Sequence, residues 1–394
     1  MANLFRSRAV TAANLWRVAG FACALCAPVS WAACWRPVAP SDPKAAGSFL
    51  VGGLESGRLL IVDGGQGTVT GSLGPHFRIE GYQALDSARS TLYKTGVLDD
   101  STHRLLALDL VDRRVLWSER LSDNTGFRRI VAGLEVFGST ALAVSGKGDM
   151  AALTTGRLGA LDGVAFFGLP GLSLVGRPLV MDVRPGGLAW FPPNARHPVG
   201  GWIIASRPPE QRIVGDVLYL VDGVESTLAD TTVLPAGEPF YEFAVSPDGL
   251  SLIVGTRSRI MALSLTDWPR LRSVPRPANG TFVVADDGRI YVFDFGLAFD
   301  SPGSGYAHVL GQDLASEGRI NLVFPPGAAP TPLGQGVVSK EGLIVVPTGT
   351  TRIGPLFGVS KTRLLLARAG TGAFSSVDLD DWGTGYAVAL PTAR

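Results

Sequence analysis

The sequence contains few of the residues from which covalent and metal-binding sites are built. Only three of its 394 residues are cysteine and only four are histidine. Cys23 and Cys26 lie inside one apolar run, so Cys34 alone lies outside it, and we expect neither a disulfide nor a cysteine-based zinc site. None of the histidines has the spacing of a metal-ligand motif; they are His76, His103, His197 and His308. The sequence therefore predicts no metal motif and no cofactor, although ligands that converge only in space stay open.

Charge is scarce as well. Charged residues make up 18% of the chain, with a formal net charge of +1, and residues 1–32 contribute three arginines and no acid, which leaves about −2 without them. A nearly neutral surface with dispersed basic residues argues against a nucleic-acid partner. Nucleophile motifs are missing too, and the loop at 354–362 lacks the glycine that a phosphate loop has before its lysine, which is Lys361 in this chain. The catalytic residues of any enzyme activity are therefore unknown.

No hydrophobic run is long enough for a membrane span. Residues 18–32 are uncharged but number only about 15, whereas a spanning helix needs roughly 20. Arg6, Arg8 and Arg17 precede this run, and small residues end it at Ala32 and Ala33. This pattern is typical of a secretory signal peptide. We predict a signal peptide at 1–32, a linker at 33–47 and one folded domain at 48–394, in the periplasm or outside the cell.

Cys34 has two interpretations. It follows Trp31-Ala32-Ala33 directly, close to the expected cleavage point, so it is a candidate for lipidation. A lipoprotein signal has an aliphatic residue where Trp31 stands, which favours an unmodified thiol. Contact with a membrane is expected only if Cys34 is lipidated.

Glycine and proline are abundant, with 50 and 27 residues, and they punctuate a repeated strand–turn–strand pattern. Apolar runs recur at 57–73, 103–121, 216–228, 259–274, 289–296 and 363–379. A second unit, a strand, a turn and another strand, precedes several of them, as at 243–255 and 282–292. In the turn at Ser246-Pro247-Asp248-Gly249, the proline presets φ, the aspartate bonds the backbone and the glycine supplies a positive φ. These aspartates are therefore turn residues and not catalytic acids.

Together the two units give four strands per repeat, spaced by roughly 40 to 65 residues, as in propeller blades. The sequence predicts an all-β fold, a single β-propeller, for which seven blades of four antiparallel strands fit best and six or eight also fit. An array of two-sheet sandwiches is the alternative. We expect the last strand, near 385–390, to pair within the first blade and so close the ring.

The Ser246–Gly249 turn, followed by an apolar strand and a hairpin, resembles the repeats of exported bacterial propellers of the YVTN type and of the quinoprotein amine dehydrogenase-like superfamily. The resemblance covers most of residues 48–390. It implies a propeller, and it does not carry over an activity.

Residues 182–212 interrupt the repeat, and we predict that they form a long, proline-stiffened loop. The candidate ligand-binding residues in it are Arg184, Trp190, Arg196, His197 and Trp202. Aromatic rings offer contact area at low entropic cost, and arginine can meet an anion. The competing interpretation is a rigid connection that packs its aromatic residues over a blade.

Three functions remain open. The first is a non-enzymatic binding or scaffold propeller of the cell envelope, a monomer whose protein or small-molecule partner the sequence does not identify. The second is a propeller enzyme, such as a lactonase, a lyase or a redox subunit, with its site at the central channel. The third is a passive component of a larger surface assembly.

Overall fold

The structure is a computed structural model of the whole chain. It describes residues 48–52, 57–64, 66, 68–86, 89–122, 129–131, 134–136, 141–157, 160–181, 184–207, 216–223, 227–235, 240–278, 281–294, 304–323, 329–332, 337–338, 342–352, 358–368, 374–379 and 387–390. The chain divides into two units, Met1–Arg36 and Pro37–Arg394, and all described residues belong to the second. The predicted signal peptide (1–32), the predicted linker (33–47) and Cys34 lie outside the described residues.

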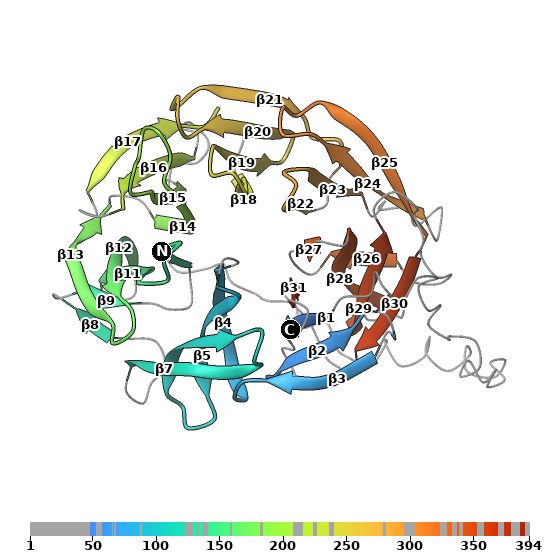
Figure 1. Cartoon of the computed structure of the whole chain (residues 1–394), viewed down its shortest axis with the longest axis horizontal. Helices are drawn as coiled ribbons and strands as arrows, with labels where there is room; N and C mark the ends of the chain where they lie inside the picture. Colours follow the sequence, from blue (N-terminus) through green and yellow to red (C-terminus); the bar gives the residue numbers. More distant parts are fainter. Residues whose placement is uncertain are drawn as a thin grey trace, which may run out of the picture. The chain divides into compact units, whose positions relative to one another are not determined.

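Regular structure in the described part of the chain consists of strands, which form seven antiparallel sheets. Five sheets have four strands each, of which the first strand named is the innermost in the ring and the last is the outermost (Figure 1). Sheet 1 contains β31 (Ala387–Ala389), β1 (Ser48–Gly52), β2 (Leu59–Asp63) and β3 (Thr68–Leu73). Sheet 2 contains β4 (Phe77–Asp86), β5 (Thr91–Leu98), β6 (His103–Asp109) and β7 (Arg114–Ser122). Sheet 4 contains β14 (Arg184–Phe191), β15 (Gly201–Arg207), β16 (Val217–Asp222) and β17 (Leu228–Val233). Sheet 5 contains β18 (Phe240–Val245), β19 (Ser251–Thr256), β20 (Arg259–Ser264) and β21 (Leu271–Pro275). Sheet 6 contains β22 (Phe282–Val284), β23 (Ile290–Asp294), β24 (Ser304–Leu310) and β25 (Ser316–Val323).

Sheets 3 and 7 contain additional strands. Sheet 3 contains β10 (Leu142–Val144), β11 (Met150–Arg157), β12 (Ala160–Gly168) and β13 (Ser173–Val180), with the added hairpin β8 (Arg129–Val131) and β9 (Leu134–Val136). Sheet 7 contains β27 (Val337–Val338), β28 (Leu343–Arg352), β29 (Gly358–Arg368) and β30 (Phe374–Leu379), with the added strand β26 (Ala329–Pro332). β9 pairs with β11 at Thr155 and Gly156, and β26 pairs with β28 at 348–351, in each case beyond the part of the strand that pairs with β10 or β27. The added strands therefore cover the inner edge of a lengthened hairpin, which would otherwise be unpaired.

The burial of the strands follows from their place in the stack. The second strands of sheets 2 and 5, β5 and β19, are buried along almost their whole length, because a neighbouring sheet covers each of their faces. Such strands are continuously apolar rather than alternating. The outer strands β3 and β17 are mostly exposed. This gradient explains why the apolar runs in the sequence mark the middle strands.

Seven hydrophobic clusters close the ring, and each contains residues of two neighbouring sheets. Phe166 and Trp202, for example, join sheets 3 and 4, and Phe49 and Val345 join sheets 1 and 7. The last strand, β31, pairs with β1 in sheet 1. The prediction of an all-β, single β-propeller is thus confirmed, as is the prediction that the last strand completes the first sheet, and the sandwich array is wrong.

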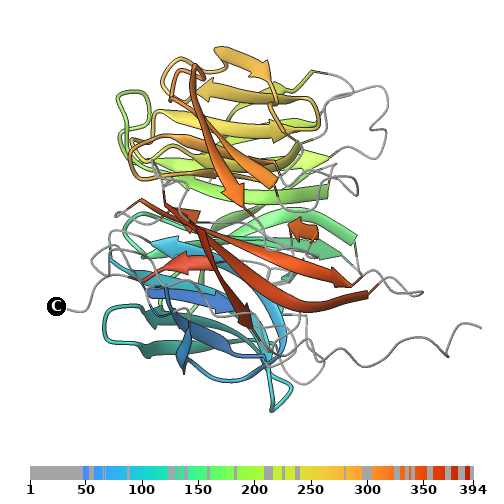
Figure 2. The same cartoon turned by 90° about the vertical axis from the view of Figure 1, so that its right-hand side faces the viewer.

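The connections define two faces of the propeller, between which the strands run (Figure 2). We call one the turn face; it carries the links from the first to the second strand, except in sheet 1 where β31 and β1 are not consecutive, and those from the third to the fourth strand. We call the other the crossover face; it carries the links between the two middle strands and those between sheets. Turns of neighbouring sheets meet on the turn face, since a Cβ placed on Gly249 would lie 2.2 Å from Cγ of Pro192. Among the described residues there is no helix that could cross a membrane.

The predicted turn at Ser246–Gly249 is confirmed and lies on the turn face. Asp248 Oδ1 accepts hydrogen bonds from Ser246 Oγ at 2.6 Å and from Leu250 N at 2.9 Å. Gly249 has a φ of +69°. The carboxylate therefore holds the turn, as the sequence indicated.

Candidate functional site

The predicted loop over 182–212 is wrong for most of its described part, residues 184–207. Residues 184–191 form β14 and residues 201–207 form β15, and the two pair in one hairpin. Only residues 192–200 form a connection between them, which lies on the turn face. The glycine and proline residues that suggested a loop are accommodated by a register shift between Pro185 and Gly187. The candidate residues therefore belong to a strand pair and one turn.

The hairpin separates Arg184 from the other four candidates. Arg184 begins β14, at the end of the strand next to the crossover face, whereas Trp190 lies at the opposite end, beside the turn. The side chain of Arg184 lies outside the described residues. The structure brings Trp190, Arg196, His197 and Trp202 together and leaves Arg184 apart from them.

Trp202 is a core residue. Its side chain is fully buried, and its ring lies 5.5 Å from that of Phe166 in sheet 3 and 4.7 Å from that of Trp190, edge to face. Trp190 is half-buried and packs against glycine backbone, since a Cβ on Gly200 would lie 2.5 Å from its ring and one on Gly223 would lie 2.9 Å away. The two tryptophans thus pack against each other within the hairpin.

The turn between β14 and β15 is organised by one side chain. Asn194 Oδ1 accepts hydrogen bonds from Arg196 N at 3.0 Å and from His197 N at 2.9 Å, and Asn194 N donates to His197 O at 2.9 Å. Gly200 N also donates to His197 O, at 3.0 Å, and its φ of +77° requires glycine. The turn therefore has a fixed backbone, although it carries no regular structure.

Arg196 and His197 have different surroundings within this turn. Arg196 Nη1 donates to the carbonyl oxygen of Trp268 in sheet 5 at 3.3 Å, and its Nη2 lies 3.4 Å from Asp230 Oδ2; the two side chains are 40% and 36% exposed. His197 is buried with its ring edge-on to Phe191 at 5.3 Å. Burial, aided by the charge of Arg196, lowers the pKa of His197 below its usual range. At neutral pH this histidine is therefore an uncharged packing group.

Three turns meet at this place and expose apolar side chains. The turn at 192–200 touches the turn at 246–250 through Pro192 and Gly249, and it touches the turn at 265–270 through Arg196 and Trp268. The exposed apolar residues form what we call the proline patch; they are Pro193, Pro198, Val199, Pro247, Leu250 and Pro269. Val199 is 43% exposed and Leu250 is 45% exposed. The half of this patch that belongs to sheet 5 was not predictable from the 182–212 segment, because those residues lie about 50 to 75 positions further along the chain.

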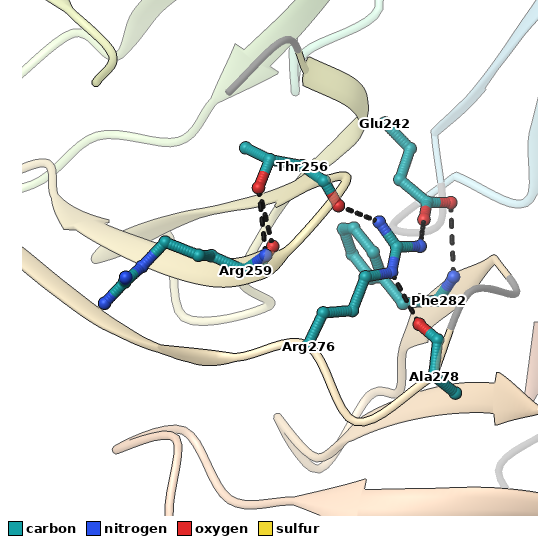
Figure 3. Close-up of polar contacts among 6 residues, drawn as sticks. All are labelled: Glu242, Thr256, Arg259, Arg276, Ala278 and Phe282. Carbon is teal, nitrogen blue, oxygen red and sulfur yellow. Dashed lines mark hydrogen bonds and ion pairs between the residues drawn. The ribbon is translucent and has the colours of Figure 1, made fainter. Parts of the chain in front are cut away.

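A second polar site lies on the crossover face, between sheets 5 and 6 (Figure 3). Arg276 donates three hydrogen bonds: from Nη2 to Glu242 Oε1 at 2.6 Å, from Nη1 to Thr256 O at 2.5 Å and from Nε to Ala278 O at 2.9 Å. Glu242 Oε2 accepts a hydrogen bond from Phe282 N, the first residue of β22, at 3.2 Å. The side chains of Arg276 and Glu242 are only 5% and 9% exposed. This pair therefore fastens sheet 5 to sheet 6.

The electrostatics of the pair agree with a structural role. Burial raises the pKa of Glu242, while the charge of Arg276 and the hydrogen bond from Phe282 N oppose that shift. Both carboxylate oxygens and three guanidinium donors are engaged within the protein. The sequence offered one signal that we did not use: Glu242 is a lone acid in the apolar strand β18, and a buried carboxylate needs a partner.

Two further histidines lie toward the crossover face in sheets 1 and 2. His76 Nδ1 lies 2.6 Å from Asp99 Oδ1, and the two side chains are 39% and 70% exposed. His103 begins β6 and is almost fully buried, which lowers its pKa from 6.5 to about 4. No group of three or more histidine, cysteine, aspartate or glutamate residues in the described part of the chain is placed to hold a metal ion.

Comparison with known proteins supports the fold. No family model matches the chain, and no curated protein matches it. The periplasmic gluconolactonase PpgL of Pseudomonas aeruginosa is 13% identical, with 88% of this chain and 100% of that one covered and a TM-score of 0.57. A functionally unknown protein from Desulfotomaculum acetoxidans is 14% identical over 87% and 99% of the two chains, with a TM-score of 0.56. The β-propeller domain of Cps50 (Swd1) from Myceliophteria thermophila is 14% identical over 79% and 89%, with a TM-score of 0.51. At such identities the likeness shows the β-propeller fold alone.

Proposed function

We propose that this chain is a non-enzymatic binding propeller of the bacterial cell envelope and that it binds a protein partner through the proline patch on its turn face. The observation that supports the proposal is the meeting of three turns from sheets 4 and 5, which together expose Pro193, Val199 and Leu250. An exposed apolar area with a polar rim is the usual form of a protein interaction site. Arg196 and Asp230 provide that rim.

The patch is suited to binding because its backbone is already ordered. Asn194 fixes one turn and Asp248 fixes the next, each with two hydrogen bonds to neighbouring residues. Proline side chains lose no rotamer freedom when a partner covers them. Little conformational entropy is lost when a partner binds such a surface. Burial of a modest apolar area is therefore enough for stable binding.

The enzyme alternative draws no support from the innermost strands. The acidic side chains of these strands that the structure describes are Asp86 of β4 and Glu242 of β18; the side chain of Glu80 in β4 lies outside the described part. Asp86 Oδ1 accepts a hydrogen bond from Arg89 N, and Glu242 binds Arg276 and Phe282 N. These carboxylates hold the backbone and the neighbouring sheet together, which is a structural task.

The proposal also covers three predictions made from the sequence: that the protein is exported, that the ring has seven blades, and that the protein is related to a family of exported propellers. The proposal of export rests on the sequence of residues 1–32, and lipidation of Cys34 is an alternative that stays open. Each of the seven sheets is taken as one blade, with the hairpin β8–β9 and the strand β26 as additions to two of them. The kinship with YVTN-type and quinoprotein amine dehydrogenase-like propellers rests on turn sequences such as Ser246–Gly249.

Site-directed photocrosslinking in the native envelope tests the binding site. A photoreactive phenylalanine replaces Val199 in the full-length protein, and a matched control carries it at Val233, which is 56% exposed on the outer strand β17. We expect one protein to crosslink at position 199 and not at 233, and the adduct to disappear when Leu250→Asp is added. Equal yields at the two positions, or an adduct that Leu250→Asp leaves unchanged, would overturn the proposal.

A further inference from the structure

The turn face beside the proline patch carries an excess of negative charge. Four connections of sheets 5 and 6, at 246–250, 265–270, 285–289 and 311–315, are fully described. They contain two arginines, Arg270 and Arg289, and five aspartates, all of them exposed: Asp248, Asp267, Asp286, Asp287 and Asp313. Glu317, at the start of β25, adds another exposed carboxylate, and Arg272, at the start of β21, adds an exposed cation, so six carboxylates face three arginines here.

The two arginines in these turns are already paired. Arg270 Nη1 lies 3.7 Å from Asp267 Oδ2. Arg289 Nη1 lies 3.2 Å from Asp287 Oδ2, and its Nε lies 2.8 Å from Glu317 Oε2. Within the described residues, Asp248, Asp286 and Asp313 have no ion pair with a cation. Three carboxylates beside the patch are therefore uncompensated.

This excess has a local cause. Asp248 caps its turn through Leu250 N, and Asp313 caps its turn through Ala315 N at 2.9 Å. Tight turns between strands favour aspartate because its carboxylate bonds the backbone two residues ahead. On this side of the propeller the turns thus bring a net negative charge to the rim of an apolar surface.

We infer that the partner docks on the proline patch with a cationic protein segment whose lysine or arginine residues alternate with aliphatic ones. The inference rests on the proposed function, since it specifies the partner for the same patch. Aliphatic side chains cover Val199 and Leu250, and the cations reach Asp248, Asp286 and Asp313. An anionic segment is repelled by the same carboxylates, so the surface selects by charge as well as by apolar area.

The first experiment measures binding of two peptides to the full-length protein. One peptide alternates lysine with leucine, and the other alternates glutamate with leucine. We expect the lysine peptide to bind at least tenfold more tightly at low salt, and we expect added salt to weaken its binding. Equal affinity of the two peptides, or binding that salt leaves unchanged, overturns the inference.

Two variants show whether that binding uses this surface. Asp286→Lys reverses a charge that holds no turn, and we expect it to weaken binding of the lysine peptide about tenfold. The matched control is Asp112→Lys, in a turn of sheet 2, on the same face but distant from the patch; Asp112 is 58% exposed and lies 3.5 Å from Arg114. An equal loss in both variants shows a general charge effect and overturns the inference.

The photocrosslinked adduct distinguishes failure of this inference from failure of the proposed function. If position 199 gives no specific adduct, the binding site itself is wrong. If it gives one, mass spectrometry identifies the crosslinked segment of the partner. A segment with lysine or arginine beside aliphatic residues supports the inference, and a segment without basic residues refutes it while leaving the proposed function intact.

Discussion

Arg196 and Arg276 both take part in contacts between neighbouring sheets of the propeller, Arg196 directly and Arg276 through Glu242, but they lie on opposite faces and in different surroundings. Arg276, on the crossover face, is 5% exposed and donates to one carboxylate and two carbonyl groups. Arg196, on the turn face, is 40% exposed and reaches its two partners at 3.3 and 3.4 Å. The buried arginine belongs to the framework of the fold, whereas the exposed one borders a surface that a partner can reach.

The difference shows how to separate structural from functional polar groups in a propeller. A buried charge that loses its partner leaves the other charge without compensation, so removal of one member alone is expected to destabilise the fold strongly. An exposed pair contributes little to folding and is free to take part in binding. The following variants test this contrast, in order of decreasing effect.

The largest effect is expected for Arg276→Leu, which leaves the Glu242 carboxylate buried without its cation. Breaking a buried ion pair costs about 3–5 kcal/mol of the free energy of unfolding. Urea denaturation of the variant and of the double variant Glu242→Leu/Arg276→Leu measures this cost. We expect the double variant to recover more than half of the loss. A single variant as stable as the parent protein would show that the pair does not fasten the sheets.

His103→Gln is expected to change the acid sensitivity of folding. Burial lowers the pKa of His103 from 6.5 to about 4, so the unfolded chain takes up this proton at a higher pH than the native protein. The contribution of His103 to the free energy of unfolding is fully present above pH 6.5 and is lost as the pH falls toward 4. The total loss is about 3 kcal/mol. Unfolding free energies across that range should fall less steeply in His103→Gln. An unchanged slope would contradict the burial of this imidazole.

Gly200→Ala is expected to disturb the turn that supports the proline patch. Its Cβ would lie 2.5 Å from the ring of Trp190 and 2.7 Å from the carbonyl oxygen of Phe191, at a φ of +77°. Gly171 provides the control, since its φ is +95° but no atom lies within 4 Å of a Cβ there. Backbone strain costs each variant about 1–2 kcal/mol, and we expect Gly200→Ala to cost about 1 kcal/mol more. Equal melting temperatures of the Gly200→Ala and Gly171→Ala variants would show that the ring of Trp190 moves aside at little cost.

The smallest effect is expected for Arg196→Ala. The pair with Asp230 is more than a third exposed on each side, so its loss should cost at most about 1 kcal/mol. Thermal denaturation of Arg196→Ala beside Arg276→Leu gives the direct comparison. A loss at Arg196 as large as that at Arg276 would remove the distinction between the two faces.

The fold was largely readable from the sequence, for local reasons. The turn at Ser246–Gly249 has the residues that its backbone requires, and the second and third strands are continuously apolar because neighbouring sheets cover both faces. The hairpin at 184–207 was missed because its prolines and glycines mimic a loop, while Trp202 and Ile203 are in fact core residues. Composition alone does not distinguish a bulged strand from a loop.

The candidate site was only half predictable. Trp190, Arg196 and His197 are close in sequence, so one unusual segment indicated them together. Pro247 and Leu250 join them only because sheet 5 packs beside sheet 4, and no linear pattern expresses that neighbourhood. The same limit applies to Arg276, which meets Glu242 across 34 positions.

The pairing of β31 with β1 joins the latest and the earliest synthesised strands of the domain in one sheet. The inner edge of β1 therefore has no partner until residues 387–389 arrive. Synthesis from the N-terminus reaches this strand last, and the first sheet is completed only then. Shortening the chain from its far end should consequently yield an open arc that self-associates through its free edge.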